Sequence, residues 1–363
     1  MTKITQSLLA VFICSSVYAQ DVEVTGTITR TIQVPAQQTN STLKNKSPQN
    51  STKTISLLKV NVSEKAKQHF INQAKAINSN RMLLKSNAVR YELPEQVQLG
   101  MNDVPVLDQG VHGTCVTFAV TAAYDALLNQ GDYLSQVCQL QLGNYLQTNG
   151  YAPSGWDGSL GRIALNQIDQ FGVISKAKQR EAGCAGMAEY PVYSAGNSES
   201  MTPEEYHQLS EQLDPMTISW SSILDVNELS DETLDTDLVL TKVKQSLVLG
   251  DRVTFGVLLY DINRGLAGAE GKYKANNDSW VLTPEIMRDL FWVFSYDNIG
   301  AHEMVITGYD DNAEAVDEKG RTYKGLLTLR NSWGSNLGDA GNFYMSYDYF
   351  RTLVIESQRI RKE

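Results

Sequence analysis

The chain has 363 residues, of which 42% are hydrophobic and 20% are charged. This length and apolar content support a sizeable core, in one large domain or two modest ones, and exclude a globally disordered chain. The formal net charge is −10 and no basic stripe runs along the sequence, so nucleic-acid binding has no electrostatic support.

The amino-terminal residues 1–19 have the pattern of a secretory signal peptide. Lys3 supplies the positive start and residues 8–14 (LLAVFIC) the short apolar centre. Residues 17–19 (VYA) have small residues at the positions that a signal peptidase prefers, so we expect cleavage before Gln20. We therefore expect a secreted protein, extracellular or periplasmic in transit. A membrane anchor and a lipoprotein at Cys14 are the alternatives, but the apolar run is far shorter than the ~20 residues that span a bilayer.

Residues 20–92 differ in character from the rest of the chain. The apolar residues between Val22 and Val34 all fall on even positions, and this period of two predicts a half-buried strand, or a hairpin bent near Gly26 or Arg30. The elements predicted next are a polar loop over 35–53, a strand over 55–62, a helix capped by Ser63 and ending near 78, and an extended stretch to about 92.

The second region, residues 93–363, carries most of the apolar segments. Residues 115–130 predict a buried central helix closed by Gly131. Residues 194–240 are acidic and polar, and we expect an inserted surface segment with a short helix after Thr202. The other predicted helices are 159–171 and 242–249, and the predicted strands are 252–260, 303–308, 325–330 and 341–347. A helical half followed by a strand-rich half predicts an α+β fold with a cleft between the halves.

Three cysteines remain once the signal is removed: Cys115, Cys138 and Cys184. An odd number in an exported protein leaves a free thiol or an intermolecular bond. If one thiol is kept for chemistry, Cys138 and Cys184 are free to form a disulfide, which an oxidising exterior permits. Cys115 starts the apolar helix, where the helix dipole and free backbone N–H groups favour the thiolate, the form that attacks.

A thiol nucleophile needs a base, and His302 is the best placed of the four histidines because it begins an apolar strand. Asn331, at the end of another apolar strand, can accept a hydrogen bond from the imidazole and fix its tautomer and orientation. Trp333 can shield that bond from water. Gln109, six positions before Cys115, carries an amide that can donate to an oxyanion.

Together these blocks resemble the papain-like cysteine peptidases, which use a Cys-His-Asn arrangement. The matching segments are PVLDQG at 105–110, GTCVTFA at 113–119, the His302 strand and NSWG at 331–334, in that order. The resemblance covers about residues 93–350 and implies a two-lobed fold. It implies that Cys115 is the nucleophile, His302 its base and later acid, Asn331 the orienting residue, and Gln109 an oxyanion donor.

The resemblance also implies substrate contacts. Residues 156–160 (WDGSL) resemble the glycine-containing segment that pairs with a substrate backbone, so Gly158 and Ser159 are expected substrate-binding residues. Ala301, where the family commonly has a polar residue, and Trp333 are expected beside them. The resemblance implies no cofactor and no metal.

The sequence departs from the family in several places. The cysteine pair that the family usually joins falls at His112 and Trp156, so that disulfide is absent. Cys115 and His302 are 187 positions apart (302 − 115), against roughly 130–150 in the family, and the segment 194–240 would supply much of the excess.

Residues 20–92 do not resemble the usual all-helical propeptide of the family. We expect them to be an inhibitory pro-segment with residues near 79–92 laid along the cleft; a permanent non-catalytic module is the alternative. The whole sequence thus predicts a secreted, bacterial, monomeric cysteine protease, made as a zymogen, that acts on proteins or peptides and uses neither nucleic acid nor membrane as partner. A catalytically inactive papain-fold peptide-binding protein and another Cys-His acyl-transferase are the alternatives.

Overall fold

The computed structural model describes residues 20–34, 51–80, 93–194, 199–214, 217–259, 268–270, 278–293 and 299–363. The predicted signal peptide, most of the predicted loop over 35–53 and residues 81–92 of the predicted extended stretch lie outside these ranges. Within the described ranges, no helix combines the length and the apolar character needed to cross a membrane.

The amino-terminal region is a long β-hairpin followed by a helix. Strand β1 (Val22–Val34) pairs antiparallel with β2 (Ser51–Val62) along its whole length. The period-of-two segment is therefore one continuous strand, and the expected bend near Gly26 or Arg30 is wrong: the register only shifts between Val24 and Gly26, in a bulge where Gly26 has φ 137°. Helix α1 (Glu64–Asn80) follows, and the Ser63 hydroxyl accepts from the Ala66 N–H at 3.2 Å, as a cap should.

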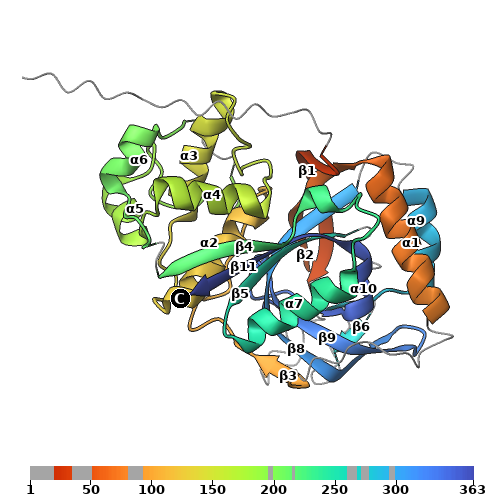
Figure 1. The fold of residues 1–363 in the computed structure, drawn as a ribbon. Coiled ribbons are helices and arrows are strands. Elements are labelled where there is room, and N and C mark those ends of the chain that lie inside the picture. The colour runs from red at the N-terminus through yellow and green to blue at the C-terminus, as the bar shows by residue number, and fades with distance from the viewer. Residues whose placement is uncertain are drawn as a thin grey trace, which may run out of the picture.

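A group of helices lies on one side of the molecule (Figure 1). It consists of α3 (Gln136–Thr148), α4 (Gly161–Phe171), α5 (Lys176–Ala182) and α6 (Pro203–Leu209). The central helix α2 (Cys115–Leu128) is buried over most of its length and ends at Asn129, whose φ of 58° is left-handed, rather than at Gly131. A disulfide joins Cys138 of α3 to Cys184, 46 residues later.

A large sheet forms the other side. Its first strands, in spatial order, are β4 (Ile218–Leu224), β11 (Val354–Lys362), β5 (Arg252–Leu258) and β8 (Ile299–Asp317). Strand β8 continues into a closed ring with β6 (Gly268–Glu270), β7 (Ser279–Trp280), β10 (Asn342–Ser346) and β9 (Thr322–Arg330). Both β2 and β3 (Gln96–Gln98) also pair with β8, so the amino-terminal hairpin belongs to this sheet.

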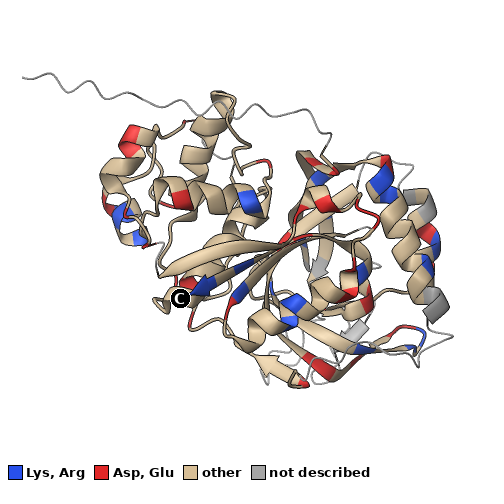
Figure 2. Cartoon of the chain, in the orientation of Figure 1, with Lys and Arg blue, Asp and Glu red and all other residues tan. Residues whose placement is uncertain are grey.

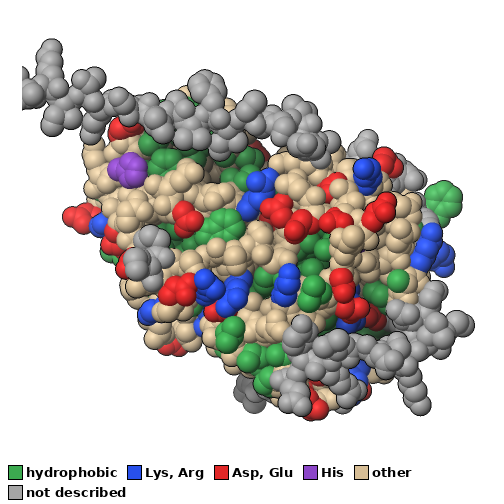
Figure 3. Space-filling model, in the orientation of Figure 1, with side chains coloured by type: hydrophobic (Ala, Val, Ile, Leu, Met, Phe, Trp, Pro, Cys, Tyr) green, Lys and Arg blue, Asp and Glu red, His purple; other side chains and the backbone are tan. Residues whose placement is uncertain are grey.

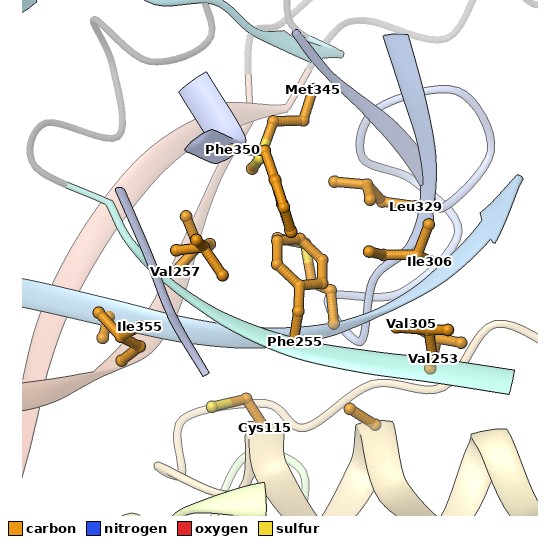
Figure 4. Close-up of a cluster of buried hydrophobic side chains, with 14 of the residues drawn as sticks. Cys115, Val253, Phe255, Val257, Val305, Ile306, Leu329, Met345, Phe350 and Ile355 are labelled. Atoms are coloured by element: carbon orange, nitrogen blue, oxygen red, sulfur yellow. The ribbon is translucent and has the colours of Figure 1, made fainter. Parts of the chain in front are cut away.

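The remaining helices pack around the sheet. They are η1 (Val226–Glu228), α7 (Thr236–Val248), α9 (Pro284–Val293) and α10 (Tyr347–Leu353). Phe255 and Phe350 pack against each other at 5.7 Å in the core (Figure 4). The α+β class and the division into a helical and a strand-rich part are confirmed, and Figure 1 places β1 and β2 between the helical group and α1.

The expectation of a surface segment over 194–240 is wrong for part of that range. Strand β4 lies within it and pairs antiparallel with β11, from Ile218 opposite Lys362 to Leu224 opposite Ser357. The segment looked polar because the serines between its apolar residues face outward on an edge strand, where only one side needs to be buried. The short helix after Thr202 is present as α6, with both bonds of a capping box.

Acidic and basic residues are interspersed along the chain (Figure 2), and their side chains are mixed over the face drawn in Figure 3. Among the described residues the ion pairs are mostly local or join neighbouring elements, as in the pair between Arg321 and Glu285. The pair that reaches from the hairpin into the second region joins Lys53 to Asp108 at 2.5 Å. This pair lies beside the residues that the sequence analysis singled out.

Candidate active site

Cys115 is the first residue of α2, which packs against strands β5 and β8 of the sheet. Figure 4 draws it beneath strands β5 and β8, with Phe255 and Phe350 on their far side. It is a free thiol with no exposed surface. The backbone N–H groups of Glu303, Val116 and Cys115 lie close enough to the thiol to favour its charged form. The first turn of the helix and the start of β8 therefore meet at this sulfur.

His302 and Asn331 form a hydrogen-bonded pair. The imidazole Nε2 of His302 lies 2.7 Å from Oδ1 of Asn331, and since that oxygen only accepts, Nε2 carries the proton. The pairing of β8 with β9, which sets Val305 opposite Arg330, brings the two residues together. The Trp333 ring lies nearly parallel to the imidazole at 4.6 Å and covers the pair. Within the part of the chain that the structure describes, Nδ1 of His302 is buried and has no hydrogen-bond partner.

Gln109 is held on several sides. The Ser332 hydroxyl donates to its Oε1 at 2.8 Å, and its backbone N–H donates to the Ser332 carbonyl at the same distance. Its Nε2 donates to the carbonyl of His112 at 2.8 Å and to that of Ser56 at 3.2 Å. The amide that the sequence predicts to be an oxyanion donor thus already has a carbonyl from the amino-terminal hairpin as acceptor.

Burial pushes the two titrating groups toward their neutral forms. Removal from water raises the pKa of the Cys115 thiol to about 12, and the nearby Glu303 carboxyl also raises it. Removal from water lowers the pKa of His302 to about 4, against a smaller opposite effect of the bond to Asn331. At neutral pH the site therefore holds a thiol and a neutral imidazole, and the charged pair that nucleophilic attack needs is not formed.

The hairpin contacts segments on several sides of Cys115 and His302. Leu58 of β2 pairs with Ala301, the residue before the histidine. The Lys53 ammonium donates to the Trp333 carbonyl at 2.7 Å as well as to Asp108. The Ser56 hydroxyl donates to the Val111 carbonyl at 2.6 Å. Strand β2 therefore contacts the segments on either side of the predicted catalytic residues.

Two glycines make room for the other contacts of the hairpin. A Cβ on Gly158, whose φ is 112°, would come within 2.6 Å of Val24 and 2.9 Å of Leu58. A Cβ on Gly113 would collide with the methyl of Thr27. The hairpin is therefore in direct backbone contact with the glycine segment and with the turn before Cys115.

The expected substrate-binding residues divide into two sets. Gly158, Ala301 and Trp333 all contact the hairpin. Ser159 is buried and instead lines a small cavity with Thr117 and Ile168, between α2 and α4. The structure brings three of the four together around one strand.

The part of the amino-terminal region that reaches the site also differs from the expectation. Residues 81–92 were expected along the cleft and lie outside the described residues, whereas the described residues that contact the site belong to β1 and β2. Sequence reasoning missed Lys53, which it assigned to a polar loop, and Tyr190, whose hydroxyl reaches Gln109. Their partners lie 55 and 81 positions away, so no local pattern could identify them.

A scan against models of protein families found no match, and neither did a search of the curated proteins. Solved structures do match. Xylellain, a cysteine protease from Xylella fastidiosa, is 20% identical over 75% of this chain and 87% of its own, with a TM-score of 0.45. The proform of the ragweed pollen cysteine protease Amb a 11 is 17% identical over 78% of this chain and 74% of its own, with a TM-score of 0.41. Procathepsin L 3 of Tenebrio molitor is 15% identical over 82% of this chain and 78% of its own, with a TM-score of 0.44. At such identities and TM-scores the likenesses carry no argument about activity, which rests on the side chains themselves.

Proposed function

We propose that this chain is a papain-like cysteine protease made as a latent precursor, with Cys115 as nucleophile, His302 as base and acid, and Asn331 as orienting residue. One observation carries the proposal: a free thiol at a helix start faces a strand whose histidine is hydrogen-bonded to Asn331 beneath a tryptophan. A structural role alone would not require a buried imidazole with one nitrogen unpaired.

The reaction is acyl transfer. The Cys115 thiolate attacks a peptide carbonyl carbon, and the oxygen takes up the negative charge beside Gln109 Nε2 and the Cys115 backbone N–H. The His302 imidazolium gives its proton to the departing amine as the C–N bond breaks, which leaves a thioester. Neutral His302 then takes a proton from water, whose oxygen attacks the thioester; the C–S bond breaks and releases the carboxylic acid.

The hairpin makes the precursor latent. It occupies the Gln109 amide with the Ser56 carbonyl, and it holds both titrating groups out of water. Displacement of β1 and β2 would return water to the site, which lowers the pKa of the thiol and raises that of the imidazole toward the charged pair.

We also propose that residues 1–19 are a signal peptide and that the protein is exported, in agreement with the Cys138–Cys184 disulfide. A first residue near Gln20 keeps Asp21, whose carboxylate accepts from the Ser63 hydroxyl and from the Ser230 N–H, both at 2.7 Å. Amino-terminal sequencing of the exported chain tests the cleavage position, and a chain that still begins at Met1 outside the cell contradicts it.

Covalent labelling tests the protease assignment. The full chain is incubated with an epoxysuccinyl thiol-protease inhibitor, before and after displacement of the hairpin by mild acid or limited proteolysis, and its mass is measured. We expect one adduct on Cys115, formed much faster after displacement, and none on a Cys115→Ala variant. Cleavage of a peptide library by the displaced form must accompany labelling. A displaced chain that takes up no inhibitor and cuts no peptide would contradict the proposal.

A further inference from the structure

The Tyr190 hydroxyl joins the two ends of the loop that leads into α2. It donates to the backbone carbonyl of Gln109 at 2.8 Å, and it lies 2.8 Å from the Thr114 hydroxyl. A phenol has one proton, and the carbonyl takes it, so Thr114 is the donor in the second bond. Burial raises the pKa of Tyr190, so the phenol remains protonated and remains a donor. One hydroxyl thus links the residue of the oxyanion amide to the residue before the nucleophile.

The Tyr190 ring is held by other aromatic rings. It lies parallel to Trp156, with centroids 5.9 Å apart and an angle of 11°, and meets Phe118 edge to face at 4.9 Å. His112 packs edge-on against both Tyr190 and Trp156. Such pairs stabilise a site beyond the area that they bury. The ring therefore cannot swing away without disturbing α2 and the glycine segment together.

The residues after Tyr190 fasten the same loop from outside. His112 Nε2 donates to the Pro191 carbonyl at 2.8 Å, and the Val111 N–H donates to the Val192 carbonyl at 3.2 Å. A Cβ at Gly110, whose φ is 59°, would collide with that same carbonyl. The segment 190–192 thus clamps the loop 109–114 through non-covalent contacts along its length.

We infer that Tyr190 is a positioning residue for the oxyanion hole, acting through Gln109 and Thr114; this rests on the proposed function. A catalytic amide has to be held to within about 0.5 Å. Ser332 fixes the side chain of Gln109 from the strand-rich side, and Tyr190 fixes its backbone from the helical side. The stretch from Gln109 to Cys115 spans the junction between these sides, so loss of the Tyr190 hydroxyl lets the amide move relative to the sulfur.

The test compares Tyr190→Phe with Tyr193→Phe, which removes the same hydroxyl three residues later from a ring that is 80% exposed. Full chains are activated identically, and their active sites are titrated with an epoxysuccinyl inhibitor. Two rates are then measured: peptide hydrolysis, which passes through an oxyanion, and alkylation by iodoacetamide, which needs the thiolate but forms no oxyanion. For Tyr190→Phe we expect kcat to fall about tenfold, with KM and the alkylation rate within about twofold of wild type. Tyr193→Phe should match wild type in all three.

The other possible results would each overturn the inference or the proposed function. Equal losses of hydrolysis and alkylation in Tyr190→Phe mean general loosening and overturn the inference, as does a hydrolysis rate equal to that of Tyr193→Phe. If Tyr190→Phe does not fold, Thr114→Val is tested in the same way, because the Thr114 side chain makes no helix-capping bond that would be lost as well. A wild-type chain that is alkylated but hydrolyses no peptide overturns the proposed function itself, which separates the two failures.

Discussion

At the scale of single residues, the hydrogen bond between His302 and Asn331 determines the tautomer and the orientation of the imidazole. With Nε2 committed to the Asn331 oxygen at 2.7 Å, the imidazole has one tautomer and one orientation, and only Nδ1 is left for proton transfer. Trp333 stacks on the imidazole and excludes water, which strengthens that bond.

Asn331→Ala should therefore lower kcat far more than it changes KM. The imidazole loses its acceptor and samples orientations in which Nδ1 faces away from the sulfur, so we expect kcat to fall about 10²-fold. Steady-state kinetics on the activated enzyme measure this split.

The matched control is Asn227→Ala, which removes an exposed asparagine whose side chain bonds only a neighbouring aspartate at 2.8 Å. An Asn331→Ala enzyme with the kcat of this control would contradict the orienting role. Thermal unfolding of both variants shows whether the change is confined to the site.

The residues predicted from the sequence and those missed differ in how they are recognised. Cys115, His302 and Asn331 stand in short motifs, and the resemblance of these motifs, taken together and in order, to the papain-like peptidases implies the chemistry expected of them. Lys53 and Tyr190 act on partners far along the chain, and their importance depends on pairings that no local period specifies. The amide of Gln109 was predicted, whereas the carbonyl from Ser56 that occupies it was not.

At the scale of elements, the hairpin shows how strands can be predicted without their partners. Alternation of apolar residues identified β1, and the apolar segment 55–62 predicted β2. Neither pattern showed that β2 adds to the edge of β8 beside His302, since edge pairing depends on backbone groups that every residue carries. The edge strand β4 was missed for a related reason, as its half-buried face looks polar in sequence.

Lys53 anchors the hairpin at the site, and its removal should weaken latency. Its ammonium is largely buried between the Asp108 carboxylate and the Trp333 carbonyl. Lys53→Met keeps the length of the side chain and removes both bonds. Partly buried bonds to a charged group stabilise by about 1.5–3 kcal/mol, so we expect the unprocessed precursor to be labelled on Cys115 at least about tenfold faster.

Lys59→Met is the control on the same strand. The Lys59 side chain lines a pocket with Asn61 and Lys67, away from Asp108. Inhibitor labelling followed by mass spectrometry compares the two precursors, and equal rates would show that Lys53 does not hold the hairpin closed.

At the scale of the whole molecule, two parts that the sequence separates form one sheet and one buried site. The α+β division and the order of most elements were predictable, because long apolar periods dominate both halves. The contacts of the hairpin were not, since they join residues 22–62 to segments spread from Asp108 to Trp333. Closure in this way buries two titrating groups, and latency is therefore coupled to pH.

Acid should open the precursor through His302. Its pKa is about 4 in the closed state and near 6.5 in water, so below pH 6.5 the open state binds a proton that the closed state refuses. The closed state therefore becomes less stable as the pH falls below 6.5. The equilibrium constant for opening rises by up to about tenfold per pH unit, and this rise ends near pH 4. We expect amide hydrogen exchange in β2, corrected for its intrinsic pH dependence, to accelerate over this range in a Cys115→Ala precursor that cannot process itself. A Cys115→Ala/His302→Gln precursor, which lacks the imidazole, isolates the contribution of the histidine. If the acid dependence is the same in both precursors, His302 is not the group that opens the hairpin.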